Sequence, residues 1–566
     1  MYGLGSAVIS ALSLRIYCPL TKNTEQKDRA PTMSTPHSDV ENREAAVAVE
    51  PAPGDLSDPR DPREWHRQAF GLILGLALAA LVYFIFPSDA PETVLQSTGA
   101  DPEVDYSHQA MRIVAATTVL MGAWWMTEAI PLAATALLPI AIFPLAGVAG
   151  FSAVGSPYAS ATIFLFMGGF LLALGLQRWN VHRRMALAVV LAVGTSPKRL
   201  ILGFMIATGF LSMWVSNTAT AVVMLPIGLS VLSLTAGLVG GMRKQKKFAT
   251  ALMLSIAYSA SIGSLGTLIG TPPNALLAGY MSEAHGIVIG FGQWMLVGVP
   301  LAAVFTVIAW LVLITVFKPE MDEIPGGREL IREEIRKMGK WTQPQISVAI
   351  IFVIAALSWV FVPLIMDWTG SALGYNDAIV GIIAGLLMFA IPADAKSGVR
   401  LLDWKTANEL PWDVLLLFGG GLSLSGMFTA TGLSLWIGEK AKALEVLPVF
   451  LLMAAVALLV LVLTEFTSNT ATAATFLPIM GGVAVGIGLT AATEMNILLL
   501  TIPVALSATC AFMLPVATPP NAIAFGSGYV KIGDMIKGGV WLNAIAVVLI
   551  ALVSYFVAIP VFGLIV

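Results

Sequence analysis

Long apolar segments separated by short polar loops fill the chain from about residue 68 to its end. Apolar segments of about 20 residues are typical of membrane-spanning helices, because a helix of that length crosses the hydrocarbon core. In the first part of the chain they lie at about 68–86, 110–128, 129–148, 160–177, 248–283 and 294–317. In the second part they lie at about 346–366, 376–392, 410–432, 492–528 and 538–563. The pattern predicts an all-α polytopic membrane protein with about 11 transmembrane helices.

Two polar phrases interrupt the apolar pattern, once in each half. SNTAT begins at Ser216 and again at Ser468, whereas GTPPNA begins at Gly270 and ATPPNA at Ala517. Ser-Asn-Thr favours turns and helix N-caps, and paired prolines remove two amide donors and push the preceding residues out of the helical region. Non-helical backbone at membrane depth must be buried in protein or line a cavity. Both phrases therefore predict helix breaks that form a site inside the membrane.

The distribution of basic residues predicts how the chain crosses the membrane, because such residues gather on the cytoplasmic side. Basic clusters lie at 178–184, 242–247, 318–340, 396–405 and 531–537. They share one side only if the segments around Ser216 and Ser468 enter the membrane and return as re-entrant hairpins. The N-terminus is then cytoplasmic, the C-terminus is extracytoplasmic, and residues 68–340 and 341–566 form two halves of inverted topology. Inverted-topology repeats recur in secondary transporters.

The N-terminal segment differs in composition from the rest of the chain. From about Thr21 to Arg67 it is rich in Pro, Ser, Asp, Glu and Arg, which cannot bury a core. We therefore predict that residues 1–67 form a disordered cytoplasmic tail. The first residues lack a basic segment and a clear cleavage site, which argues against a secretory signal, and Met33 is a second candidate start. The expected location is the inner (plasma) membrane.

Composition narrows the class of protein further. Hydrophobic residues make up 57% of the chain and charged residues only 11%, whereas soluble domains carry about 25% charged residues. The chain has no basic stripe outside short loops, so no nucleic-acid partner is expected. The two cysteines, Cys18 and Cys510, do not make a disulfide framework.

The chemistry of the two phrases suits ions of both signs. Backbone carbonyls at a helix break, together with Ser, Thr and Asn oxygens, form a ligand set for Na⁺, and the N-termini of half-helices attract a carboxylate. Neither phrase contains a charged side chain. Bound cations must then compensate an anionic substrate, which predicts that Na⁺ binds before the anion.

Two acidic residues lie near the phrases. Glu128 stands near a predicted helix end, where a capping or interfacial role is expected. Glu465 stands three residues before Ser468 and is either a proton-coupling group or a stabiliser of the second hairpin.

Other function classes find little support in the sequence. A phosphate-binding P-loop is missing, which argues against an ATP-driven pump. The five histidines have no metal-ligand spacing, and no nucleophile–base grouping indicates catalysis, so an enzyme is not expected. An ion channel remains an alternative, because re-entrant hairpins in inverted repeats also occur in pores, although the interrupted helices favour alternating access.

The twin SNT segments, each followed by a TPPN break, resemble the divalent anion/sodium symporter family, as does WWMTEAIPLAATALLP at 124–139. The resemblance covers about 65–566. It implies a homodimer whose protomers have a scaffold domain and an elevator-type transport domain. It also implies Na⁺-coupled symport of C4-dicarboxylates such as succinate, malate or fumarate. Citrate and sulfate carriers and Na⁺-independent dicarboxylate exchangers share this fold, so they remain alternatives.

The resemblance also assigns binding residues to the chain. It implies a first sodium site at Ser212, Ser216, Asn217 and Gly270, and a second at Thr464, Ser468, Asn469 and Ala517. It implies a substrate pocket lined by Asn217, Thr218, Pro272, Asn469, Thr470, Thr518 and Pro519. Ser212 and Thr464 each stand four residues before the motif serine, so the internal repeat supports them independently. Gly270 and Ala517 differ between the halves, although both offer a backbone carbonyl.

Overall fold

The computed structural model describes residues 62–97, 104, 106–194, 196–239, 241–321, 327–370, 374–394 and 396–566. All but the last residues of the predicted tail lie outside these ranges. The chain separates into two units, residues 1–66 and 67–566, and the second unit carries both phrases. In its described residues the strands are limited to the short antiparallel pair β1 (Pro392–Asp394) and β2 (Val399–Arg400).

The helices that precede the first SNT segment include several short pieces. They are α2 (Pro62–Ile85), α3 (Ala90–Leu95), α4 (His108–Thr127), α5 (Leu132–Thr135), α6 (Leu138–Leu145), α7 (Phe151–Gly155), η1 (Ser156–Ala159), α8 (Ala161–Arg178) and α9 (Val181–Val193). The apolar segment 129–148, expected as one span, is divided into α5 and α6. Pro139 explains the division, because it lies in the first turn of α6 and cannot continue a helix from α5.

The first SNT segment and the first break lie among the next helices. These are α10 (Pro197–Ser212), α11 (Asn217–Val239), η2 (Met242–Gln245), α12 (Lys246–Ser264), η3 (Leu268–Gly270), α13 (Pro272–His285) and α14 (Phe291–Val316). A second group comes after them, formed by α15 (Gly327–Lys337), α16 (Gln343–Thr369), α17 (Asp377–Ala390), α18 (Trp404–Ala407), α19 (Trp412–Ala430), α20 (Leu433–Ala441) and η4 (Lys442–Val446).

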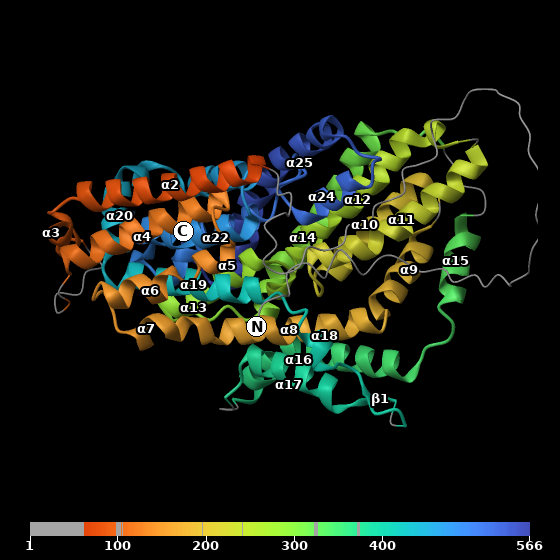
Figure 1. Cartoon of the computed structure of the whole chain (residues 1–566), viewed down its shortest axis with the longest axis horizontal. Coiled ribbons are helices and arrows are strands. Elements are labelled where there is room, and N and C mark those ends of the chain that lie inside the picture. The colour runs from red at the N-terminus through yellow and green to blue at the C-terminus, as the bar shows by residue number, and fades with distance from the viewer. Residues whose placement is uncertain are drawn as a thin grey trace, which may run out of the picture. The chain divides into compact units, whose positions relative to one another are not determined.

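The C-terminal helices repeat the plan of α10–α14. They are α21 (Val449–Thr464), α22 (Asn469–Gly486), η5 (Leu489–Ala491), η6 (Glu494–Ile497), α23 (Leu498–Ala508), α24 (Pro519–Gly526), α25 (Ile532–Val553), the π-helical turn η7 (Ser554–Ala558) and α26 (Ile559–Phe562). Figure 1 labels α10 to α14 of the first set and α22, α24 and α25 of the second.

Seven helices in the described residues are long and apolar enough to cross a membrane. Four shorter apolar helices accompany them, at Leu132–Leu145, Asp377–Ala390, Val449–Thr464 and Glu494–Ala508. These features bear out the predicted all-α polytopic membrane protein. Length alone does not test the re-entrant hairpins, since α11 is itself long enough to cross, so the number of crossings stays a prediction.

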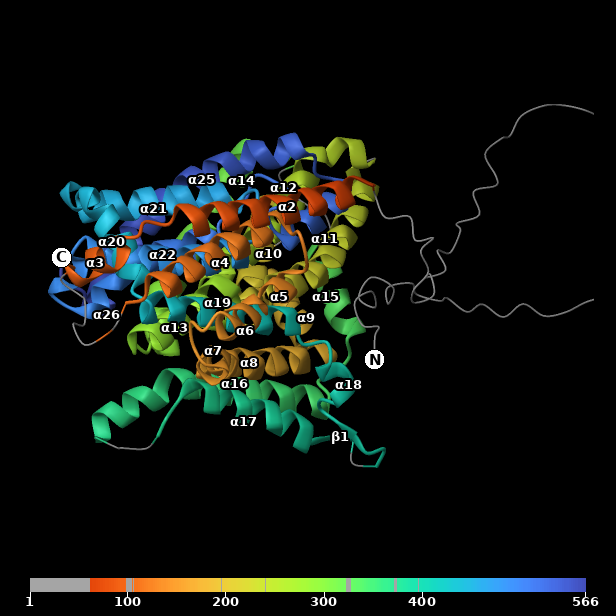
Figure 2. The same cartoon turned by 60° about the vertical axis from the view of Figure 1, so that its left-hand side comes forward.

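The two repeated sets of helices are interleaved. Helix α10 packs against α12, and its counterpart α21 packs against α23. The second arms cross over between the halves, because α11 packs against α24 and α22 packs against α13. Helices α8, α16 and α17 pack on one another along one side of the bundle (Figure 2), and α8 also contacts α13 while α16 contacts α14. The motif residues therefore all lie in the interleaved helices.

Close backbone contact joins the first arm to the broken helix. A Cβ atom on Gly263 of α12 would lie 2.2 Å from the carbonyl oxygen of Gly209 on α10. Only glycine allows so close an approach at this position. The contact brings the end of α10, where Ser212 lies, beside the end of α12, where the helix breaks.

Candidate functional site

The first SNT segment is the connection between α10 and α11, and its polar side chains begin α11. Ser216 Oγ accepts a hydrogen bond from the backbone N–H of Ala219 at 3.2 Å, and Asn217 Oδ1 accepts one from Thr218 N–H at 2.8 Å. These bonds satisfy N–H groups that the first turn of a helix leaves open. Ser212, at the end of α10, is fully buried, and its hydroxyl donates to the carbonyl of Ala260 on α12 at 2.6 Å.

The second SNT segment repeats this arrangement between α21 and α22. Thr464 ends α21 as Ser212 ends α10, and it is also fully buried. Its Oγ1 lies 2.8 Å from the carbonyl oxygen of Ala508 on α23 and 2.8 Å from Asn469 Oδ1. In both halves, a hydroxyl at the hairpin therefore links to the helix that precedes the break.

The first break separates α12 from α13 at the TPPN phrase. Thr271 is the N-cap of α13, and Pro272 and Pro273 occupy its first two positions, where a helix needs no N–H donor. Asn274 then reaches back across the break, and its Nδ2 donates to the carbonyls of Ser264, Leu265 and Thr267 at 3.4, 3.3 and 2.9 Å. The predicted interruption of the helix is present, and the side chain of the phrase itself bridges it.

The second break separates α23 from α24 in the same way, across a longer loop. Asn521 Nδ2 donates to the carbonyls of Ala511 and Leu514, both at 3.0 Å. Thr518 Oγ1 accepts from the N–H of Asn521 at 3.3 Å and caps α24.

The longer second loop accounts for the difference between Gly270 and Ala517. In the first loop, a Cβ atom on Gly270 would lie 2.3 Å from the carbonyl oxygen of Ser264. Backbone of this kind cannot move aside as a flexible side chain would, so the first loop requires glycine. The second loop carries a Cβ at Ala517 and holds its backbone by a hydrogen bond from Ala517 N–H to the carbonyl of Leu514 at 3.3 Å.

Glu465 anchors the second loop to the second hairpin. Its fully buried carboxylate accepts from the backbone N–H groups of Phe512, Met513 and Leu514, with shortest distances of 2.7, 3.0 and 3.2 Å. Asn543 Nδ2 on α25 donates to the same carboxylate at 2.6 Å. These partners are all donors, so the carboxyl oxygens of Glu465 serve only as acceptors. Of the two roles considered from the sequence, the geometry favours stabilisation of the hairpin.

Glu128 lies at a helix end, as the sequence indicated. It is the C-cap of α4, in the left-handed conformation with φ 49°. Its carboxylate forms an ion pair with Arg67 at 3.0 Å, and both side chains are more than half exposed. Glu128 therefore fits the capping and interfacial role.

The two breaks contact each other. Thr271 Oγ1 at the first break lies 3.4 Å from Thr509 Oγ1 at the start of the second loop. The residues assigned to the substrate all lie at the starts of helices, where backbone N–H groups and the helix dipole favour an anion. Asn217 and Thr218 begin α11, Asn469 and Thr470 begin α22, Pro272 begins α13, and Thr518 and Pro519 begin α24. The arrangement combines oxygen-lined breaks with four helix N-termini.

The oxygen atoms around Thr464 fit a cation. Its single hydroxyl proton serves one acceptor, yet two oxygen atoms lie at hydrogen-bond distance, Ala508 O and Asn469 Oδ1. The second contact is then satisfied either by a bound cation or by rotation of the Asn469 amide, which would turn its NH₂ group toward Thr464. Neutral hydroxyl, amide and carbonyl oxygens are ligands that proteins offer to Na⁺. Among the described residues no group of three or more His, Cys, Asp or Glu side chains forms a metal cluster.

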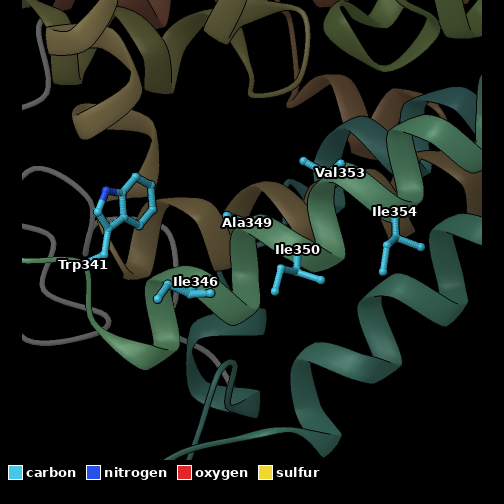
Figure 3. A pocket seen from close by; sticks show the side chains of 6 residues that line it. All are labelled: Trp341, Ile346, Ala349, Ile350, Val353 and Ile354. Atoms are coloured by element: carbon cyan, nitrogen blue, oxygen red, sulfur yellow. The ribbon is translucent and has the colours of Figure 1, made fainter.

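Two hollows in the surface lie away from the motif residues. The first is an apolar groove of about 390 Å³ on α16, lined by Trp341, Ile346, Ala349, Ile350, Val353 and Ile354 (Figure 3). Its aliphatic lining does not suit an anion. The second, of about 350 Å³, includes Tyr375, Asn376 and Asp377 before and at the start of α17, and touches the first break only through Leu268.

Comparison with known proteins agrees with the geometry. The family described as "Sodium:sulfate symporter transmembrane region" matches residues 100–564. The chain belongs to this family. That result confirms the resemblance to the divalent anion/sodium symporters that the SNT and TPPN phrases indicated.

Named relatives cover most of the chain. The sodium-dependent dicarboxylate transporter SdcS of Staphylococcus saprophyticus is 42% identical over 503 residues, which cover 88% of this chain and 92% of the relative. SdcS of Staphylococcus aureus strain USA300 is 41% identical over 503 residues with the same coverage. Among solved structures, the YdaH transporter of Alcanivorax borkumensis aligns with a TM-score of 0.50 and 14% identity. That alignment covers 88% of this chain and 99% of YdaH, and it bears on the fold alone.

The structure also identifies residues that the sequence did not single out. Asn274, Asn521 and Asn543 hold the breaks, and Trp294 of α14 donates from its indole nitrogen to the carbonyl of Leu265 at 3.1 Å. The repeated TPPN spacing could have indicated the first two. The contacts of Asn543 and Trp294 have no counterpart in the sequence pattern.

Proposed function

We propose that the protein is a secondary active transporter that couples Na⁺ to the symport of C4-dicarboxylates such as succinate, malate or fumarate. The observation that carries the proposal is the repeated pairing of an SNT hairpin connection with a TPPN break, lined by neutral oxygens. The relatives named sodium-dependent dicarboxylate transporters support the choice of ion and of substrate class.

The two sodium ions bind at equivalent places in the two halves. Ser212, Ser216, Asn217 and the carbonyl of Gly270 hold the first ion, and Thr464, Ser468, Asn469 and the carbonyl of Ala517 hold the second. These ions supply the positive charge that neutral side chains do not provide to a dianion. The substrate then binds at the helix N-termini, against Asn217, Thr218, Pro272, Asn469, Thr470, Thr518 and Pro519.

The proposal extends to the whole protomer and its assembly. Residues 68–340 and 341–566 are inverted halves, with the tail in the cytoplasm and the C-terminus outside the inner membrane. The interleaved helices that carry the motifs move as one transport domain, by an elevator mechanism, against a scaffold that includes α8, α16 and α17. The extensive packing of α17 on α8 and on α16 supports grouping these three helices together. Two protomers form a homodimer through their scaffolds.

Uptake by the purified protein in proteoliposomes tests the proposal. Radiolabelled succinate should accumulate when Na⁺ is supplied outside and should not accumulate when choline or K⁺ replaces it. Unlabelled citrate and sulfate, added in turn, report whether the pocket takes these anions instead. Uptake that ignores Na⁺ and requires a dicarboxylate inside the vesicle would make the protein an exchanger and overturn the symport proposal.

A further inference from the structure

We infer that Asn274 and Asn521 are positioning residues for the two sodium sites, each fixing the direction of one carbonyl ligand. The inference rests on the proposed function, and neither asparagine is assigned there. Both residues occupy the third position of the helix after a break, behind two prolines. Both are fully buried.

The two asparagines share two contacts in the two halves, and Asn274 has a third, to the carbonyl of Leu265. Asn274 Nδ2 donates to the carbonyls ten and seven residues earlier, those of Ser264 and Thr267. Asn521 Nδ2 donates to the carbonyls ten and seven residues earlier, those of Ala511 and Leu514. Because both spacings occur in both halves, these contacts are not accidental. The amide orientation is set by chemistry, because a flipped amide would turn its oxygen toward carbonyl oxygens.

The shorter of these contacts closes a ring around the proposed carbonyl ligand. The bond from Asn274 to Thr267 encloses Gly270, and the bond from Asn521 to Leu514 encloses Ala517, each three residues after the accepting carbonyl. A closed backbone ring has few conformations, so the direction of the carbonyl inside it is set. Helix ends otherwise leave such carbonyls free to turn toward any donor.

Stability alone does not account for the two asparagines. In each, the amide oxygen is buried and has no hydrogen-bond donor among the described residues. An unpaired buried acceptor opposes folding. If the asparagines served only to stabilise the loops through their amide nitrogens, the unpaired amide oxygen would reduce that stabilisation in both halves. A role in positioning a sodium ligand explains why asparagine is present in spite of this cost.

The test uses Asn274→Leu and Asn521→Leu, which keep the approximate shape of the side chain and remove its donor without adding a charge beside the ion. Asn496→Leu is the matched control, because Asn496 is also buried and donates to two carbonyls, those of Leu489 and Ile565, at 2.8 and 2.7 Å. Succinate uptake by full-length protein in proteoliposomes is measured against Na⁺ concentration, and again with Li⁺ in place of Na⁺.

We expect each of the two site variants to raise the Na⁺ concentration for half-maximal uptake by about tenfold, as the loss of two buried hydrogen bonds implies. The ratio of Li⁺-supported to Na⁺-supported uptake should also change, since a displaced carbonyl alters the size of the ion cage. The control should lose only maximal rate, through a smaller folded fraction, and keep both ion parameters.

Each outcome decides one question. Wild-type uptake that does not respond to Na⁺ would remove the proposed function, and the inference with it. A second result is wild-type uptake that depends on Na⁺ together with site variants that show the same half-maximal Na⁺ concentration and the same Li⁺-to-Na⁺ ratio as the control. That result would overturn the inference and leave the proposed function standing. If a Leu variant does not fold, Asn274→Ser or Asn521→Ser replaces it, and the Na⁺-dependent rise in unfolding temperature of the detergent-purified protein serves as the readout.

Discussion

Thr464 and Ser212 are hydroxyl ligands in the two proposed sodium sites. Each is a fully buried hydroxyl at the end of a hairpin arm, bonded to a carbonyl of the neighbouring broken helix. The remaining oxygen lone pairs have no other donor among their contacts in the described chain, which leaves them available to a cation. The proposed sodium sites therefore rely on neutral oxygen atoms and not on charged side chains.

Removing the Thr464 hydroxyl tests this dependence directly. Thr464→Val keeps the shape and deletes one ligand, so the Na⁺ concentration for half-maximal uptake should rise by about tenfold, the cost of one or two polar contacts. Thr467→Val is a suitable control, because Thr467 lies in the same connection and bonds to the carbonyl of Leu463 at 2.9 Å. Equal Na⁺ dependence in the two variants would exclude Thr464 from the site.

Gly270 gives a second prediction at this scale, and its basis is steric. A methyl group there would lie 2.3 Å from the carbonyl oxygen of Ser264, so Gly270→Ala must displace the first loop. We expect uptake to fall by at least about tenfold, as displacement of a precisely held ligand implies. The reciprocal change Ala517→Gly needs no displacement and should keep most activity; comparable losses in both variants, measured as initial uptake rates, would contradict this interpretation.

At the scale of elements, the helix breaks are held by contacts between helices as well as by their own prolines. Glu465 connects the end of α21 to three consecutive N–H groups of the second loop and to α25. Met213 occupies the corresponding place after α10, and there the hydroxyl of Thr267 donates to the Met213 carbonyl instead. The two halves thus share a plan but hold their loops by different bonds.

Glu465→Gln is expected to destabilise the protein, because an amide presents donors to groups that are themselves donors. The expected loss is about 1–3 kcal/mol, the usual cost of leaving buried hydrogen-bonding groups without partners. The midpoint of thermal unfolding in detergent measures it. Unchanged stability, together with loss of a pH dependence of uptake, would instead assign Glu465 to proton coupling.

Sequence pattern predicted the breaks well because proline and the Ser-Asn-Thr turn act locally. Helix α13 begins at Pro272 and α24 at Pro519, as the TPPN phrases implied. The pattern did not predict the donors of Glu465 or the cross-contact of Thr271 with Thr509, 238 residues away, because such partners are chosen by helix packing. It also joined 129–148 into one segment, where Pro139 begins a new helix.

At the scale of the molecule, the interleaved helices bring the proposed ion sites and the proposed substrate pocket into one unit. Helix α11 meets α24 and α22 meets α13, so each hairpin contacts the broken helices of both halves. Binding at one site should therefore support binding at the others. A dianion without basic partners then depends on the sodium ions for its affinity.

The central claim is that succinate binding depends on bound sodium ions. The most direct test is equilibrium binding of radiolabelled succinate to the purified protein. Binding is measured over a series of Na⁺ concentrations, with choline as the balancing cation. We expect succinate affinity to rise steeply with Na⁺, with a slope on logarithmic axes above one because two ions bind with each anion. No measurable binding is expected in choline alone. Succinate binding of equal affinity in Na⁺ and in choline would contradict the claim.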